Sequence, residues 1–155
     1  MNDQQKVRVL YVDDEKNNLL SFKASFRRDF DITIAESGNE ALDILESNEF
    51  DIIITDQRMP EMTGIQFLES VLKSYPEPIR ILLTGFSDIQ AVIDAINKGQ
   101  VYRYLTKPWN EDEIRQIIYS CFEVLSLRRE NSRLLKDLER ANSQLEFMIR
   151  QKLLS

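Results

Sequence analysis

The sequence predicts an α/β fold in which five short strands form one parallel sheet, doubly wound with helices on both faces. Two observations support this prediction. Apolar runs of four to six residues alternate with longer amphipathic stretches through the first 108 residues. These runs are dense in valine, isoleucine and leucine, which is typical of strands buried on both faces. The 155-residue chain is long enough for one such domain and a further segment.

The first two strand–helix units lie near the N-terminus. Strands are predicted over residues 7–12 and 32–35, where apolar residues follow one another. The first helix is predicted over residues 16–30, because leucine and phenylalanine recur there at helical spacing. The second helix is predicted from residue 40 to about 46, after an opening at Gly38.

The third unit contains the most strand-like run of the chain. Residues 52–55 include three isoleucines in succession, a residue type that favours strands. Residues 57–64 contain Pro60 and Gly64, which predict a loop. The helix predicted over residues 65–75 is stopped by the prolines that follow it.

The last two strands flank the fourth helix. Strands are predicted over residues 79–83 and 102–106, and the helix over residues 88–97, ended by Gly99. The apolar residues expected on one face of this helix are Ile89, Val92, Ile93 and Ile96. Right-handed crossovers between parallel strands leave few topologies for these units.

Polar side chains follow four of the five predicted strands. Asp13 and Asp14 come after the first strand, Asp56 after the third, Thr84 after the fourth and Lys107 after the fifth. Ligands of such sheets bind at the carboxyl ends of the strands, so we expect these side chains to lie together.

This group of residues is suited to phosphoryl transfer. Three carboxylates in a chain without histidine favour a hard cation with oxygen ligands, and Mg²⁺ is the natural choice. A carboxylate such as Asp56 can attack phosphorus, while Mg²⁺ and Lys107 balance the charge and Thr84 donates a hydroxyl. A single aspartate at a strand end is more often a helix cap or turn former, and a single threonine or lysine there indicates little. The combination predicts a phosphoacceptor site.

The C-terminal 45 residues have a different pattern. Residues 111–155 contain no proline or glycine, so one helix of about 65 Å can cover them. One set of seam residues recurs every seven positions: Ile117, Val124, Asn131, Leu138 and Leu145. The other set lies between them: Leu127, Leu134, Ala141 and Met148. This seam predicts a dimeric coiled coil over about four heptads, in which Asn131 would fix a parallel register. The alternative is a long amphipathic helix packed against another domain.

Composition and charge exclude several classes of protein. The net charge of −6 arises entirely before residue 111, so a general nucleic-acid surface is not expected. No apolar run approaches the roughly 20 residues that span a bilayer, and no signal peptide is visible. The single cysteine, Cys121, fits a reducing cytoplasm.

Four segments resemble the receiver domain of two-component response regulators, the CheY-like family. They are VLYVDDE, IIITDQRMPEMTG, ILLTG and YLTKPW. The resemblance covers residues 6 to about 122, and the Asp-x-x-Met-Pro-x-Met-x-Gly run from Asp56 to Gly64 is its most specific part. It implies a flavodoxin-like sheet of strand order 2-1-3-4-5. It also divides the chain into a receiver domain over residues 1–122 and a coiled-coil extension over residues 123–155, continuous with the last receiver helix.

The resemblance also implies a role for each site residue. Asp56 would be the phosphoacceptor for a sensor histidine kinase. Lys107 would pair with the phosphate, and the Lys107–Pro108 peptide is expected to be cis. Asp14, Asp56 and the backbone carbonyl of Arg58 would hold Mg²⁺ directly, and Asp13 through a water. Thr84 would be the switch hydroxyl and Tyr104 the switch aromatic, with Tyr102 as the competing candidate. The chain would be a phosphoacceptor with slow self-dephosphorylation and not an enzyme.

Two features depart from the simplest members of the family. The segment from Thr84 to Lys107 is about one residue longer, and Arg58 places a long cation beside the phosphate. Arg58 is expected to alter the lifetime of the acyl phosphate, in a direction that the sequence does not give. The stretch GQVYRYLTKPW resembles a receiver subgroup joined to enzymatic output domains.

Other interpretations stay open on the sequence alone. A degenerate receiver would serve only as a dimer scaffold. A Mg²⁺-dependent phosphohydrolase with an aspartyl nucleophile is disfavoured, because Asp13 and Asp14 are adjacent where that class has Asp-x-Asp. The seam stops in mid-pattern at Ser155, which favours a fragment of a longer regulator whose output domain follows. The alternative is a stand-alone receiver with a separate partner.

Overall fold

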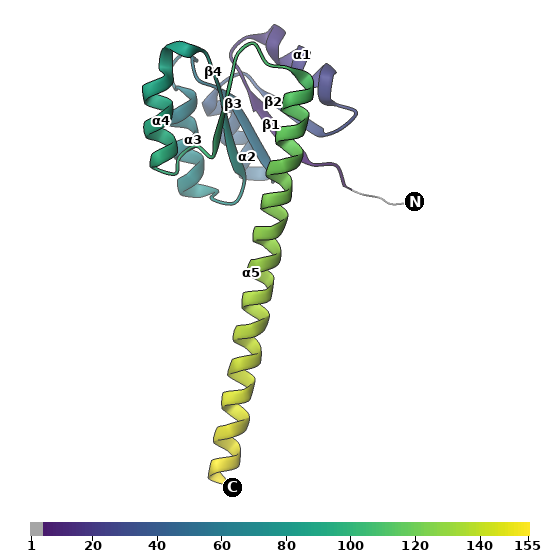
Figure 1. The fold of residues 1–155 in the computed structure, drawn as a ribbon, viewed down its shortest axis with the longest axis vertical. Coiled ribbons are helices and arrows are strands. Elements are labelled where there is room, and N and C mark those ends of the chain that lie inside the picture. The colour runs from purple at the N-terminus through teal and green to yellow at the C-terminus, as the bar shows by residue number, and fades with distance from the viewer. Residues whose placement is uncertain (1–4) are drawn as a thin grey trace. The chain divides into compact units, whose positions relative to one another are not determined.

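The computed structural model describes residues 5–155 and contains the predicted five-stranded parallel sheet (Figure 1). The strands are β1 (Arg8–Val12), β2 (Asp31–Ala35), β3 (Ile52–Asp56), β4 (Ile79–Thr84) and β5 (Arg103–Thr106), in the order β2-β1-β3-β4-β5. The predicted fold class and the flavodoxin-like strand order are therefore confirmed.

Helices connect the strands in the expected alternation. They are α1 (Lys16–Phe26), α2 (Gly38–Ser47), α3 (Gly64–Ser74), α4 (Ile89–Asn97) and α5 (Glu111–Leu154), with a short 3₁₀ turn η1 (Phe86–Asp88) before α4. The chain divides after Phe122 into two compact units, which are described separately below. No helix within residues 5–155 is long and apolar enough to cross a membrane.

Buried side chains cover both faces of the sheet in the first unit. Leu10 and Val12 of β1 belong to a core cluster that also includes residues of α2, α3 and α4. Tyr11, between them, points to the opposite face and stacks on Phe22 of α1, with ring centroids 4.0 Å apart. Alternation along a strand therefore sends successive β1 residues into two different cores.

Two helices differ in detail from the sequence pattern. The helix predicted over residues 16–30 ends at Phe26, and Phe30 is buried beyond it. In α4, Val92 and Ala95 are buried, whereas Ile89 is 39% and Ile93 42% exposed. Helical spacing identified an apolar stripe but could not say which edge of the stripe packs on the sheet.

The C-terminal seam begins later than its heptad pattern suggests. Ile117 lies in the first unit and is buried in its core, at 5% exposure, so it cannot also face a partner helix. From Leu127 on, the apolar seam residues of the second unit are more than half exposed: Leu127, Leu134, Leu138, Leu145 and Met148. The exposed part of the predicted seam therefore runs from Leu127 to Met148, and Ile117 is not part of it.

Candidate functional site

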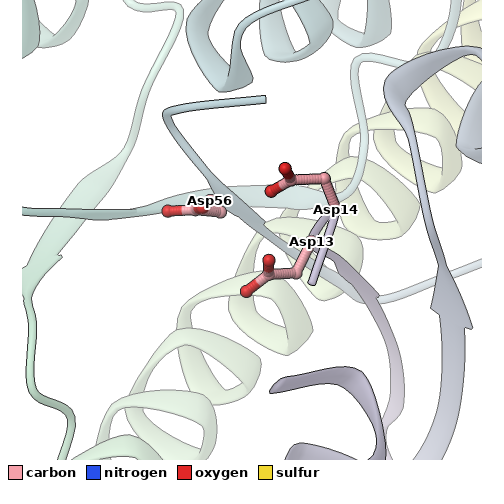
Figure 2. A group of neighbouring side chains, drawn as sticks. All are labelled: Asp13, Asp14 and Asp56. Carbon is pink, nitrogen blue, oxygen red and sulfur yellow. The ribbon is translucent and has the colours of Figure 1, made fainter. Parts of the chain in front are cut away.

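Three aspartates meet at the carboxyl edge of the sheet (Figure 2). Because β1 and β3 are adjacent and parallel, Asp13 and Asp14 after β1 lie beside Asp56 at the end of β3. Each contributes a carboxylate oxygen to a group whose atoms lie within 4.8 Å of one another. Like charges this close repel, and a hard cation with oxygen ligands offsets that repulsion. The donor set therefore fits Mg²⁺, which these three residues would hold.

Asp13 is fixed by hydrogen bonds before any ion binds. Its Oδ2 accepts from the Tyr11 hydroxyl at 2.8 Å and from the Asn18 amide at 3.1 Å, and its Oδ1 accepts from the Glu15 backbone N–H at 2.9 Å. Burial and the Asp13 charge raise the pKa of Tyr11 above its ordinary value, so its hydroxyl stays a donor. Asp14, in contrast, is exposed and free to approach an ion from the solvent side.

Asp56 lies opposite the ammonium group of Lys107. The distance from Lys107 Nζ to Asp56 Oδ1 is 2.6 Å, and the Lys107–Pro108 peptide that positions the lysine is cis, as predicted. Burial nevertheless raises the pKa of the Asp56 carboxyl, because it outweighs the opposing hydrogen bond and charge of Lys107. The charged form of Asp56 is thus held at a cost that a bound cation would reduce.

This raised pKa predicts how Asp56→Asn changes stability without Mg²⁺. A carboxyl with a raised pKa stabilises the fold below its ordinary pKa of about 4, and loses that contribution as the pH rises through the folded value. We expect the melting temperature of Asp56→Asn to rise relative to wild type as the pH increases from 4 toward 7, because the asparagine does not have to be charged in its buried position. Thermal unfolding in chelator across this range checks it, and Mg²⁺ should shrink the gain. If the melting temperature of Asp56→Asn fell relative to wild type as the pH rises, the raised pKa of Asp56 would be contradicted.

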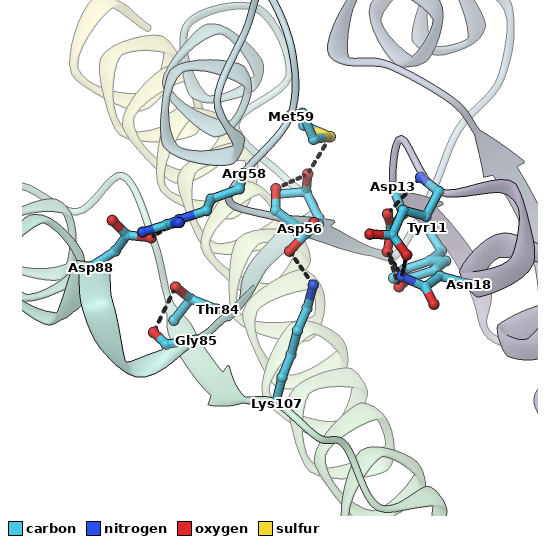
Figure 3. A network of polar contacts seen from close by, with 12 residues as sticks. Tyr11, Asp13, Asn18, Asp56, Arg58, Met59, Thr84, Gly85, Asp88 and Lys107 are labelled. Atoms are coloured by element: carbon cyan, nitrogen blue, oxygen red, sulfur yellow. Dashed lines mark hydrogen bonds and ion pairs between the residues drawn. The ribbon is translucent and has the colours of Figure 1, made fainter.

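Thr84 and Lys107 share a pocket with Asp56. The pocket has a volume of about 230 Å³ and is lined by Asp56, Gln57, Arg58, Thr84, Gly85, Ser87 and Lys107. The Thr84 hydroxyl donates to the backbone carbonyl of Gly85 at 3.1 Å, so in this arrangement it is directed away from Asp56 (Figure 3). The structure brings the carboxylate, the ammonium group and the hydroxyl together, as the sequence predicted.

Two other sequence-predicted residues lie differently. The Arg58 side chain extends away from Asp56 and pairs with Asp88, at 3.2 Å between Arg58 Nε and Asp88 Oδ2. Tyr104 lies in β5, is 40% exposed and does not line the pocket, and Tyr102, just before β5, is exposed to the same extent. The role of Tyr104 as the switch aromatic, in preference to Tyr102, stays a prediction. The role of the Arg58 backbone carbonyl as a metal ligand also stays a prediction.

The structure adds residues that the sequence analysis missed. Tyr11 and Asn18 orient Asp13, as described above. Gln57 is buried and its side-chain carbonyl accepts from the Ile65 backbone N–H at 2.9 Å, which ties the loop after Asp56 to the start of α3. Two signals in the sequence could have identified residues of this set. Tyr11 is a tyrosine within an apolar strand, and Gln57 is an amide directly after the candidate nucleophile.

Comparisons with known proteins agree with this geometry. The sequence profile of the family described as "Response regulator receiver domain" matches residues 9–119. The hydrogenase transcriptional regulatory protein HoxA of Cupriavidus necator is 32% identical over 155 residues, which are 100% of this chain and 32% of that protein. HoxA of Bradyrhizobium diazoefficiens is 27% identical over 141 residues, which are 91% of this chain and 29% of that protein. The chain thus spans about a third of the length of these curated relatives.

Solved structures show the same fold. A response regulator receiver domain protein from Clostridium thermocellum matches with a TM-score of 0.74 and 31% identity, over 78% of this chain and 98% of that one. The signal receiver domain of an HD domain-containing protein from Pseudomonas fluorescens matches with a TM-score of 0.76 and 30% identity, over 84% of this chain and 96% of that one. Since the family profile spans most of the chain and these receiver domains share its sheet, the chain belongs to the response regulator receiver domain family.

Proposed function

We propose that Asp56 accepts a phosphoryl group from a sensor histidine kinase and that this modification switches the domain. The observation that supports it most directly is the single pocket of about 230 Å³ that holds a buried carboxylate, an ammonium group at 2.6 Å and a buried hydroxyl. A carboxylate nucleophile, a cation beside it and a hydroxyl donor are the parts that phosphoryl transfer needs.

In the proposed reaction, a carboxylate oxygen of Asp56 forms a bond to phosphorus as the bond to the donor's nitrogen breaks. Lys107 stays beside the reacting carboxylate and offsets charge on the phosphoryl oxygens. Mg²⁺, when bound by Asp13, Asp14 and Asp56, supplies further positive charge at the same oxygens. The hydrogen bonds from Tyr11 and Asn18 keep Asp13 in place throughout.

The switch follows from the charge that the reaction adds. A phosphoryl group brings roughly −1.5 to −2 charges to the edge of the sheet. The Thr84 hydroxyl then exchanges the Gly85 carbonyl for a phosphoryl oxygen, and Tyr104 turns into the space that Thr84 leaves. This alters a surface that already exposes Ile89 and Ile93 of α4, and a partner that prefers the new shape shifts the population.

Phosphorylation by a small donor tests the proposal. Incubated with Mg²⁺ and phosphoramidate, the wild-type protein should gain one phosphate by mass spectrometry, and chelator should prevent it. Asp56→Asn should gain none, whereas Asp43→Asn, the same change at an exposed aspartate of α2, should behave as wild type. An unmodified wild type would favour the scaffold interpretation, and sustained turnover of phosphate esters would favour a phosphohydrolase.

We further propose that residues 123–155 join two copies as a parallel coiled coil and pass the signal to an output domain beyond Ser155 or to a separate partner. The exposed seam residues of the second unit, from Leu127 to Met148, support this. In heptad register, Glu123 of one copy lies opposite Arg128 of the other, an attractive pair that the parallel orientation makes. Longer relatives named as regulatory proteins are consistent with an output domain.

A further inference from the structure

The two loops that border the pocket are joined by one side chain. Arg58 lies two residues after Asp56 in the loop between β3 and α3, and its guanidinium reaches the turn η1 (Figure 3). Arg58 Nε donates to Asp88 Oδ2 at 3.2 Å and Arg58 Nη2 donates to Ser87 Oγ at 2.6 Å. Sequence position alone would have left this arginine beside the phosphoacceptor.

This bridge holds the turn that directly follows Thr84, the proposed switch residue at the end of β4. Ser87 and Asp88 follow Thr84 by three and four residues, and the Thr84 hydroxyl donates to the carbonyl of Gly85, the residue just before η1. Arg58 and Ser87 both line the pocket beside Asp56, whereas Asp88 lies outside its lining. The Gly85 carbonyl that accepts from Thr84 lies directly before the segment that Arg58 holds, so a shift of that segment would also move this acceptor.

A phosphoryl group changes the competition for the guanidinium. Asp88 offers a single charge, whereas a phosphoryl group on Asp56 offers roughly −1.5 to −2 charges and a geometry that arginine binds through two parallel hydrogen bonds. The Arg58 side chain is 72% exposed, so its pair with Asp88 is weak and exchanges readily. A phosphoryl group shifts the equilibrium between paired and released Arg58 only by the difference between its interaction free energies with these two states.

We propose that Arg58, Ser87 and Asp88 form a clasp that holds the turn after β4 in the unphosphorylated arrangement, and that a phosphoryl group on Asp56 opens it by taking Arg58 from Asp88. This proposal rests on the proposed phosphoacceptor function. Arg58 and Asp88 are then positioning residues, which act on Thr84 through the turn. Asp88 opposes switching because it retains the Arg58 guanidinium, which would otherwise bind the phosphoryl group.

Binding of fluoroberyllate, a non-covalent mimic of the phosphoryl group, tests the clasp in the full chain with Mg²⁺. By isothermal titration calorimetry, Asp88→Asn should bind the mimic about two- to fivefold more tightly than wild type, the range of an exposed ion pair. Asp88→Glu keeps the carboxylate and should bind as wild type does. Asp94→Asn makes the same charge change on α4, where the carboxylate accepts from Gln90 instead, and should change nothing.

The Arg58→Gln background separates the clasp from a general charge effect. Once Arg58 is absent, Asp88→Asn should no longer tighten binding, because there is nothing left to release. Affinity for Mg²⁺ alone should stay constant across the Asp88 variants, whereas loss of a nearby negative charge by itself would weaken it. An equal gain from Asp88→Asn in both backgrounds would overturn the clasp and leave the phosphoacceptor function standing. Wild type that fails to bind the mimic, or binding that survives Asp56→Asn, would overturn both.

Discussion

Gly64→Ala is expected to destabilise the domain by at least about 2 kcal/mol, in the range of overpacked buried sites. A Cβ at this position would lie 2.2 Å from the backbone carbonyl oxygen of Asp56 and 2.8 Å from Leu82 Cδ1. The first contact is with backbone, which cannot rotate away as a side chain can. The Gly64 N–H also donates to the backbone carbonyl of Gln57 at 2.9 Å, and this hydrogen bond opposes an outward movement of the loop.

Urea unfolding of Gly64→Ala measures this cost, and Gly85→Ala is its matched control. A Cβ at Gly85 would have no heavy atom within 4 Å, so its stability should stay within about 0.5 kcal/mol of wild type. Where Gly64→Ala still folds, its phosphorylation by phosphoramidate should be slower, because the methyl group pushes on the backbone of the phosphoacceptor itself. A Gly64 variant as stable as wild type would show that the loop has room that the structure does not give it.

The sequence predicted the loop that contains Gly64 but not this contact. Glycine and proline predict where a chain turns, whereas the distance from Gly64 to the Asp56 carbonyl depends on how the loop packs in three dimensions. The same holds for Arg58, whose place in the chain predicted a cation beside the phosphate while its length allows it to reach Asp88. Residues that chemistry requires at a strand end were predictable, and the partners that orient them were not.

The sheet itself was the most predictable part, for a physical reason. Strands buried on both faces require unbroken apolar runs, and residues just after parallel strands must share one edge, so Asp13, Asp56 and Lys107 were expected to meet. Helix faces were less certain, because an apolar stripe can meet a sheet, a partner or solvent. Ile117 fits the heptad pattern of the tail but is buried in the first unit, and Ile93 fits the apolar stripe of α4 but is 42% exposed.

Leu138→Asp is expected to convert a dimer of this chain into a monomer. Leu138 occupies a seam position in the middle of residues 127–148 and is 57% exposed in the single chain. In a coiled coil, burial of a leucine contributes about 1.5–3 kcal/mol. Two copies lose it at once, and the aspartates that replace them would face each other across the seam. We therefore expect dissociation to be favoured by on the order of a thousandfold or more, since about 4 kcal/mol corresponds to that factor.

Sedimentation equilibrium at micromolar concentration distinguishes this outcome, with Phe147→Asp as the matched control. Phe147 is also an exposed apolar residue of the same helix, at 61% exposure, but its heptad position is on the outer face, away from the seam. Its replacement makes the same charge change, so it should leave the dimer intact. Equal dissociation by both variants would mean that the second unit associates through a different face. A monomeric wild type would contradict the coiled-coil proposal and favour the alternative, a long amphipathic helix that packs against another domain.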